Sequence, residues 1–376
     1  MYKYRLMAPG PTPIPAEVAN IMANPIRHHR TPGFEEVVKE VKVGLKWLYQ
    51  TQNEVILFSS SGSGAMEASL VNVSSPGDRV LVINGGKFGE RFGKIAKAHQ
   101  LEADIIDVTW GHGVSPSVIQ EKLEQNEYRA VCVQASETSS AVEHPIKEIA
   151  DIVKKYDQTV LIVDAITALG VINLPVDEWQ IDFMIGGSQK ALMLPPGLAT
   201  ISVSEKAWGL IDKATCPRFY FDLLAEKKAI QKNTTAWTPA VSLVVGLKEV
   251  LKIMQDEGLP QMLERHAKMA SSIRNAAQAI GLKLLSPEAP STAVTAIYSP
   301  EGIDSGKIVA GLRNHFNMTI ANGQDDYKGK IFRIGHLGYY DMLDMATVWS
   351  AVEKQLSELG YQFELGKGVA EIIKNL

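Results

Sequence analysis

The stretch GGSQKALMLPPG, residues 186–197, places Lys190 between an apolar run and a pair of prolines. The overlapping residues DFMIGG (182–187) have the pattern of a short buried strand. A lysine at an exposed strand end is ordinarily a solvated charge. A lysine that is partly removed from water instead loses proton affinity and can act as a nucleophile. Lys190 is therefore either a surface charge or a reactive amine.

Short apolar runs like this one recur and alternate with helical patterns. Runs rich in Val and Ile lie at 55–58, 79–84, 103–108, 129–134, 159–165 and 199–204. Helical spacing appears in FEEVVKEVKVGLKWLYQ (34–50), KFGERFGKIAKAHQ (87–100) and PIKEIADIVKKY (145–156). This alternation predicts an α/β fold with a mostly parallel sheet covered on both faces.

After about residue 241 the pattern changes to long helices followed by TAVTAIYSP (292–300), MTIANG (318–323) and KIFRIGH (330–336), which indicate the strands of a smaller α+β domain. We expect a proline-rich arm at 1–15, a large domain at 16–256 and a small domain at 257–376. The boundary should fall inside a long linking helix.

Composition excludes several classes of protein. The 376 residues carry a formal net charge of −4 with 45% hydrophobic residues, and no basic stripe indicates nucleic acid as a partner. There is no membrane-length apolar run and no signal-peptide pattern, so no membrane partner is expected. Two cysteines and no HExxH spacing disfavour disulfides and a metal site. We expect a cytoplasmic protein that binds small molecules.

The residues that follow the strands carry the candidate chemistry, because ligands of parallel sheets lie beyond the carboxyl ends of the strands. SSSGSG (59–64) leads into a helix, where backbone N–H groups form either a phosphate cradle or an ordinary turn with a helix cap. Asp164 ends an apolar run and is either a ligand-binding carboxylate or a helix cap. Lys190 follows the next run, so adjacent strands could deliver both side chains to one crevice. An anion cradle, an acid for a pyridinium nitrogen and an amine together match pyridoxal phosphate.

The sequence resembles the class-V, fold-type I pyridoxal-phosphate aminotransferases, closest to the alanine/serine–glyoxylate (serine–pyruvate) branch and to bacterial class-V aspartate aminotransferases. The resemblance covers essentially the whole chain. It is carried by APGPTPIP, HHRTPGFE, SGSGAMEA, NGGKFGERF, SETSS, VDAITALG, GSQKALMLPPG, AWTPAVSLV and KIFRIGHLG. It implies a mainly parallel seven-stranded sheet covered by helices, with a smaller C-terminal α+β domain.

The resemblance also implies roles for single residues. Lys190 corresponds to the lysine that binds the cofactor aldehyde, and Asp164 to the partner of the pyridine nitrogen. Phe88 corresponds to the ring stacked on the cofactor, and Thr138 to the hydroxyl near its phenolic oxygen, although ETSSA here replaces the frequent ETSTG. The phosphate-cradle positions are Ser63, Gly64, Ala65 and Gln189.

Further positions concern the substrate and the assembly. Arg333 corresponds to the arginine that grips the substrate carboxylate, and Gly10 also lies at the substrate. Thr235 and Thr238 lie in the segment that reaches the partner's phosphate, so a homodimer with shared active sites is implied. Arg30, after His28 and His29, either meets a second substrate carboxylate or is a solvated loop charge.

The function implied by the resemblance is ping-pong transamination between alanine or serine and a 2-oxo acid, glyoxylate or pyruvate. A class-V aspartate aminotransferase is the alternative. A cysteine desulfurase or lyase on the same fold is less favoured, because Cys132 lies mid-strand and Cys216 precedes Pro217. Neither cysteine resembles a mobile catalytic thiol.

Overall fold

The computed structural model describes residues 2–376 and is built on a seven-stranded sheet. Its strand order is β2 (Val55–Phe58), β10 (Ala199–Val203), β9 (Phe183–Gly187), β8 (Val160–Asp164), β5 (Ala130–Gln134), β3 (Arg79–Asn84) and β4 (Glu102–Asp107). Strand β10 runs antiparallel to both of its neighbours, and the other pairs are parallel. The predicted mostly parallel α/β sheet is confirmed.

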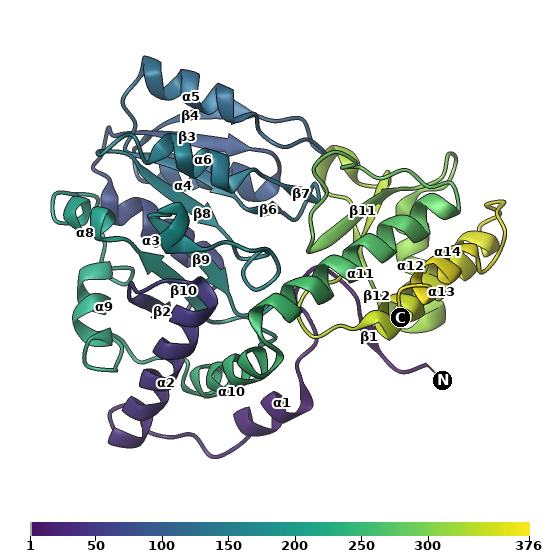
Figure 1. The fold of residues 1–376 in the computed structure, drawn as a ribbon, viewed down its shortest axis with the longest axis horizontal. Helices are drawn as coiled ribbons and strands as arrows, with labels where there is room; N and C mark the ends of the chain where they lie inside the picture. Colours follow the sequence, from purple (N-terminus) through teal and green to yellow (C-terminus); the bar gives the residue numbers. More distant parts are fainter. Residues whose placement is uncertain (1) are drawn as a thin grey trace.

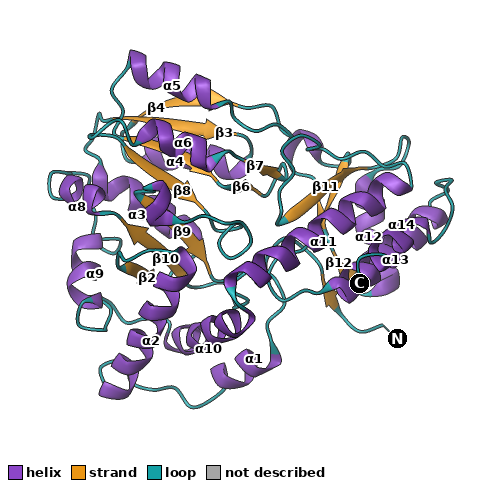
Figure 2. Ribbon diagram, in the orientation of Figure 1, coloured by secondary structure: helices purple, strands orange, loops and turns teal. Residues whose placement is uncertain are grey.

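Helices cover both faces of this sheet (Figure 2). Helices α3 (Gly62–Val73) and α4 (Lys87–Ala98) lead from β2 to β3 and from β3 to β4, in one direction across the sheet. Helices α5 (Pro116–Gln125) and α6 (Ile146–Val153) lead from β4 to β5 and from β5 to β8, in the opposite direction. Right-handed crossovers therefore place α4 and α6 on opposite faces. Because these helices follow the neighbouring strands β3 and β5, the topology predicts a ligand-binding crevice at the carboxyl ends of those two strands.

The remaining helices of this part pack around the β2 side of the sheet and its rim. They are α1 (Ala16–Met22), α2 (Pro32–Tyr49), α7 (Val176–Trp179), α8 (Glu205–Ile211), α9 (Leu223–Ile230) and α10 (Val241–Glu257). Helix α2 packs along α10, and its last residue, Tyr49, reaches the sheet, where its hydroxyl hydrogen-bonds to Thr200 Oγ1 at 2.5 Å. None of the helices within residues 2–376 is long and apolar enough to cross a membrane.

A second, smaller layer of sheet and helices follows in the sequence (Figure 1). It has its own apolar core, which includes Trp349 and Phe332. Its elements are α11 (Leu259–Ala279), β11 (Val294–Tyr298), α12 (Ser305–Phe316), β12 (Met318–Thr319), β13 (Ala321–Asn322), η1 (Asp325–Tyr327), β14 (Ile331–Gly335), α13 (Met342–Glu358) and α14 (Lys367–Ile373). Strands β11, β14 and β13 form an antiparallel sheet in that order.

Two short pairings join distant segments of the chain. β1 (Arg5–Leu6), in the N-terminal arm, pairs in parallel with β12. β6 (Ser136–Glu137) and β7 (Val142–Glu143) form a hairpin beyond β5. The arm therefore lies against the smaller layer, and the hairpin projects from the carboxyl edge of the large sheet.

The linking helix expected near residue 256 is divided in two. Helix α10 ends at Glu257, and α11 begins at Leu259. Gly258 between them has φ +87°, a left-handed conformation that glycine adopts without steric cost, and Pro260 stands in the first turn of α11. The domain boundary at 256 stays a prediction.

Candidate functional site

Lys190 lies in the turn after β9 and is 8% exposed. Its Nζ atom donates a hydrogen bond to the carbonyl oxygen of Pro9 at 2.5 Å, and its own carbonyl accepts one from Thr12 Oγ1 at 2.7 Å. Gly10 has φ +138°, and a Cβ there would lie 2.5 Å from Nζ, so the arm passes directly over the lysine. Burial lowers the pKa of Lys190 to about 8. The surface-charge alternative is therefore wrong.

Asp164 ends β8, the parallel neighbour of β9, so the two strands deliver Asp164 and Lys190 to the same edge of the sheet. Its Oδ1 accepts a hydrogen bond from the N–H of Ile166 at 2.9 Å. Burial raises the pKa of Asp164 to about 6, while the charge of Lys190 acts to lower it. No helix begins at Asp164, so the helix-cap alternative is wrong and the carboxylate caps only a turn.

The predicted phosphate cradle forms the first turn of α3, which contains Ser63, Gly64 and Ala65. Ser63 Oγ accepts a hydrogen bond from Arg91 Nη1 at 3.0 Å. Near this turn, Gln189 Oε1 is buried without a hydrogen-bond partner among residues 2–376. The side chain of Ile166 packs against both Gly62 and Gly187, which brings the start of α3 close to the end of β9.

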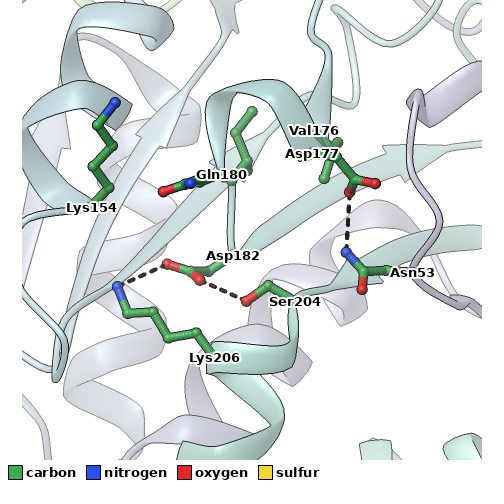
Figure 3. A pocket seen from close by; sticks show the side chains of 9 residues that line it. Asn53, Lys154, Val176, Asp177, Gln180, Asp182, Ser204 and Lys206 are labelled. Carbon is green, nitrogen blue, oxygen red and sulfur yellow. Dashed lines mark hydrogen bonds and ion pairs between the residues drawn. The ribbon is translucent and has the colours of Figure 1, made fainter.

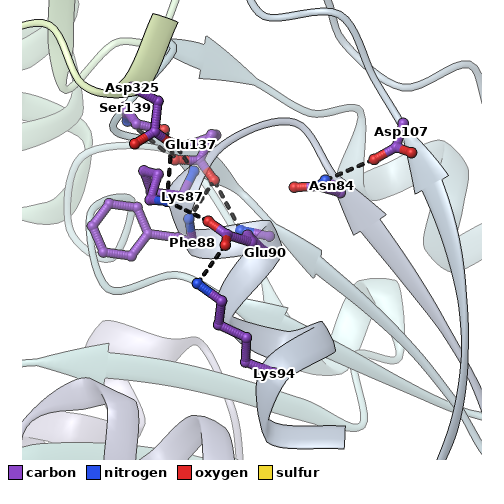
Figure 4. A network of polar contacts seen from close by, with 10 residues as sticks. Asn84, Lys87, Phe88, Glu90, Lys94, Asp107, Glu137, Ser139 and Asp325 are labelled. Carbon is purple, nitrogen blue, oxygen red and sulfur yellow. Dashed lines mark hydrogen bonds and ion pairs between the residues drawn. The ribbon is translucent and has the colours of Figure 1, made fainter. Parts of the chain in front are cut away.

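Phe88 lies in the first turn of α4, directly after β3, and its side chain is half-buried (Figure 4). The guanidinium carbon of Arg91, one helical turn later, lies 4.7 Å from the centroid of the Phe88 ring. Thr138, in the β6–β7 turn, is buried, and its hydroxyl hydrogen-bonds to Thr167 Oγ1 at 2.7 Å. Phe88 and Thr138 therefore flank the crevice between β3 and β5.

Arg333 lies in the middle of β14 and is buried. Its Nη1 donates to the carbonyl oxygen of Thr138 at 2.8 Å, while Nε and Nη2 donate to the carbonyl oxygen of Asn322 at 3.1 and 2.8 Å. Burial lowers the pKa of Arg333 to about 10. The guanidinium thus reaches from the smaller layer to the crevice of the large sheet.

Thr235 and Thr238 are not brought to this crevice. Thr235 is buried and donates its hydroxyl hydrogen to Trp237 O at 2.6 Å, whereas Thr238 is exposed. Across residues 2–376, neither threonine hydrogen-bonds to Ser63 or Lys190. Arg30 donates from Nη1 to Thr234 Oγ1 at 2.6 Å and to Thr235 O at 2.9 Å, so it anchors this segment.

Sequence reasoning missed three contributors to the site: Glu137, Arg91 and the Pro9 carbonyl. Glu137 stands between two hydroxyl residues of SETSS and is fully buried in the hairpin. Arg91 follows Phe88 by three residues, a helical spacing that places both side chains on one face. The Pro9 carbonyl could not be found from the sequence, since 181 residues separate it from Lys190.

A cavity of about 250 Å³ lies at the opposite edge of the sheet, where β9 begins (Figure 3). There, the oxygens of Asp182 accept hydrogen bonds from Leu161 N at 2.9 Å and Ser204 Oγ at 2.6 Å, and Lys206 Nζ lies 3.5 Å away. These contacts tie together the ends of β8, β9 and β10. Asp182 is therefore a structural acid far from Lys190.

The crevice at the carboxyl edge fits pyridoxal phosphate. The N-terminus of α3 offers the positive end of a helix to a phosphate, and the side-chain amide of Gln189 carries N–H groups that can donate to a phosphate oxygen. Asp164 offers a buried carboxylate to a pyridinium nitrogen, and Lys190 offers an amine whose pKa is lowered. The phosphate, the ring nitrogen and the aldehyde of the cofactor therefore each have a complementary group at this edge.

Comparisons with known proteins identify the family of the chain. The family model described as Aminotransferase class-V matches residues 10–326. The small subunit of a soluble hydrogenase from Synechococcus sp. is 42% identical over 98% of this chain and 97% of its own length. The L-aspartate–glyoxylate aminotransferase of Paracoccus denitrificans is 35% identical over 97% and 94%.

A solved structure of the ureidoglycine–glyoxylate aminotransferase from Bacillus subtilis matches with a TM-score of 0.94 and 28% identity, over 100% of this chain and 98% of that one. The family model, the aminotransferase relative and the solved structure thus indicate the same class of enzyme. The chain belongs to the class-V aminotransferase family and is a pyridoxal-phosphate-dependent aminotransferase of fold type I.

Proposed function

We propose that this enzyme transfers the amino group of alanine or serine to glyoxylate or pyruvate by a ping-pong mechanism. The observation that carries the proposal is the convergence of Lys190, Asp164 and Arg333 on one crevice, which combines an amine, a buried acid and a carboxylate-binding cation. Glyoxylate is favoured as an acceptor because both the Paracoccus relative and the Bacillus neighbour are named for it. The arrangement of these three residues is not explained by the hydrogenase name of the Synechococcus relative.

Bound pyridoxal phosphate supplies the aldehyde that accepts the amino group and the ring that withdraws electrons from the substrate Cα. Lys190 takes the proton from Cα through Nζ, a role that its pKa of about 8 suits because part of the amine is neutral near pH 7.5. Asp164 keeps a pyridinium nitrogen protonated through its negative charge. Ser63, Gly64, Ala65 and Gln189 hold the phosphate, while Phe88 and Thr138 line the ring.

Arg333 binds the carboxylate shared by donor and acceptor. Three of its N–H groups are held by backbone carbonyls, which fix the plane of the guanidinium without neutralising its charge. A fixed guanidinium suits bidentate binding of a carboxylate. Gly10 leaves room above Lys190, because any side chain there would collide with Nζ.

Aspartate is the second candidate donor, favoured by the name of the Paracoccus relative. Recognition of its second carboxylate would need a further cation. Within one subunit Arg30 does not supply it, because its guanidinium lies against Thr234 and Thr235, in the segment that is not brought to the crevice.

A desulfurase activity is disfavoured by the placement of both thiols. Cys132 is fully buried within β5, and burial raises its pKa, which keeps the thiol protonated. Cys216 is also buried, and its pKa is raised for the same reason. Neither thiol is presented to the crevice as an exposed nucleophile would be.

The proposal is tested by a matrix of donors and acceptors. Alanine, serine, aspartate and cysteine are each combined with glyoxylate, pyruvate and 2-oxoglutarate, and the amino and oxo acid products are quantified. We expect the highest kcat/KM for alanine or serine with glyoxylate or pyruvate. A clear preference for aspartate would select the alternative, and sulfide release from cysteine would point to a desulfurase.

We further propose a homodimer with shared active sites. An aromatic surface supports it: Phe219 is 76% exposed, and its ring lies 4.8 Å from that of Trp237, which stacks on Tyr220 at 6.1 Å. Exposed aromatic patches of this kind mark protein interfaces. Thr238 is exposed beside this patch, where a partner subunit would meet it.

A further inference from the structure

Glu137, the last residue of β6, is fully buried, and both of its carboxylate oxygens accept hydrogen bonds (Figure 4). Oε2 accepts from the backbone N–H groups of Phe88 and Gly89, both at 3.0 Å. Oε1 accepts from Ser139, from the N–H at 3.1 Å and from the hydroxyl at 2.5 Å. The carboxylate therefore joins the hairpin to the N-terminus of α4.

This arrangement suits a charged carboxylate. A protonated carboxyl would place its O–H on an oxygen that already faces an N–H donor, so one hydrogen bond would be lost. Burial raises the pKa of Glu137, and the four hydrogen bonds oppose that rise. The positive end of the α4 dipole also favours the negative charge.

Neighbouring hairpin residues hold the same turn. The N–H of Lys87 donates to Ser139 Oγ at 2.9 Å, and Ser140 Oγ donates to the carbonyl oxygen of Gly85 at 2.9 Å. A Cβ at Gly86 would lie 2.2 Å from Ser139 Oγ, so the hairpin contacts the turn backbone directly. The position of residues 85–89 is thus set by the hairpin as well as by β3.

We propose that Glu137 is a positioning residue for the cofactor, which fixes the ring of Phe88 by holding the backbone that carries it. The inference rests on the proposed stacking of Phe88 against the cofactor. The side chain of Phe88 is half-buried, and the guanidinium carbon of Arg91 lies 4.7 Å from the centroid of its ring. The backbone N–H of Phe88 is hydrogen-bonded to Glu137, and this bond holds the residue that carries the ring.

A general structural role is the competing explanation, and Asp182 provides the matched control. Asp182 is also a buried acid that accepts backbone and hydroxyl hydrogen bonds, but it lies at the opposite edge of the same sheet. Replacing either acid by its amide removes one charge and part of a hydrogen-bond network. Only the change at Glu137 should affect the cofactor.

The experiment titrates cofactor-free wild type, Glu137→Gln, Phe88→Ala, the double variant and Asp182→Asn with pyridoxal 5′-phosphate. The readouts are the Kd and the visible circular dichroism of the bound cofactor. Phe88→Ala should weaken binding about three- to tenfold, the range expected for loss of one ring stack. Glu137→Gln should approach the same loss and reduce the dichroism. The double variant should bind no more weakly than Phe88→Ala alone.

The direction in which Glu137→Gln changes the cofactor Kd distinguishes a positioning role of Glu137 from an effect of its charge. The charge of Glu137 raises the pKa of Asp164, so removing it favours the ionised Asp164 that would pair with a pyridinium nitrogen. Loss of a negative charge near an anionic cofactor also favours binding. On charge alone Glu137→Gln would bind the cofactor more tightly, whereas loss of position weakens binding.

Three results would overturn the inference: wild-type Kd and dichroism in Glu137→Gln, additive losses in the double variant, or wild-type cofactor binding by Phe88→Ala. If Glu137→Gln does not fold, Ser139→Ala decides, because it removes one donor to Glu137 and the acceptor of the Lys87 N–H. A wild-type Kd and dichroism in Ser139→Ala would then count against the role. These readouts need no turnover, so a wrong choice of donor or acceptor leaves them unaffected.

Discussion

Lys190 and Pro9 are joined by a 2.5 Å hydrogen bond, from the Nζ atom to the carbonyl oxygen, although 181 residues separate them in the sequence. The N-terminal arm that carries Pro9 is held in place by the pairing of β1 with β12. The amine is therefore buried by an arm anchored on the smaller layer of the fold. Its lowered pKa follows from a long-range contact as well as from its position after β9.

The first prediction concerns the catalytic role of this amine. Lys190→Ala should abolish transamination, while the fold and noncovalent cofactor binding persist, because the change removes an amine and no part of the apolar core. The measurements are turnover, circular dichroism and cofactor retention on gel filtration. Turnover retained within about tenfold of wild type, a barrier change of only ~1.4 kcal/mol, would contradict the assignment.

The second prediction concerns stability and pH. The pKa of Lys190 falls from 10.5 to about 8 on burial. Well below pH 8 the amine is protonated in both the folded and unfolded chain, and the pKa difference corresponds to a destabilisation of about 3 kcal/mol. Above pH 8 the folded chain releases its proton first, so this cost shrinks as pH rises and vanishes above about 10.5.

Lys190→Met should therefore stabilise the cofactor-free protein at pH 7, and the gain should decrease between pH 8 and pH 10.5. Urea unfolding of both proteins across this range measures the difference. Lys155→Met, at an exposed lysine, is the control and should show no such pH-dependent gain. Equal stability of wild type and Lys190→Met at pH 7 would mean that burial does not shift this amine.

The third prediction concerns Asp164. Asp164→Asn removes the charge proposed to keep the pyridine nitrogen protonated, and turnover should fall by a factor of about 100 or more, the scale typical of a lost electrostatic contact. Thermal stability should change little, because Asn can still accept from the N–H of Ile166. Steady-state kinetics and thermal unfolding measure the two effects. Near-normal turnover would mean that Asp164 only caps the turn through its bond to the N–H of Ile166.

Asp164 and Lys190 could be placed together from the sequence, because parallel strands end at a common edge and both residues directly follow apolar runs. Other features depend on tertiary contacts. MTIANG was expected to form one strand, but Met318–Thr319 pairs with the N-terminal arm and Ala321–Asn322 with β14. Glu137 could not be selected from SETSS, because its role depends on donors at the start of α4.

The fourth prediction concerns Arg333. Arg333→Lys keeps the charge but loses the planar fork, so the KM for a carboxylate donor should rise about tenfold or more while the absorbance of the bound cofactor stays unchanged. Amines that lack a carboxylate provide the control, and their kinetics should be less affected. An equal loss for both classes would indicate that Arg333 mainly holds Thr138 and Asn322.

The last prediction concerns assembly. Arg30 holds the segment that contains Thr235 and Thr238 by donating to the carbonyl oxygen of Thr235. Thr238 is exposed, whereas Thr235 is buried and its hydroxyl donates to Trp237 O. If this segment completes the partner's phosphate site, an isologous dimer presents it to both crevices. Thr238→Ala should then weaken cofactor binding more than Thr235→Ala.

Mixed dimers test whether these threonines act across the interface. Lys190→Ala protomers are exchanged with protomers that carry both Thr235→Ala and Thr238→Ala, at a cofactor concentration where each parent is inactive. If the threonines act in trans, one site of a mixed dimer has both lesions and the other has neither, so activity should return to at most one site per heterodimer. If they act within their own subunit, every site keeps one lesion and no activity returns. Absence of recovery despite subunit exchange shown by native mass spectrometry, or a fully active monomer, would reject the shared site.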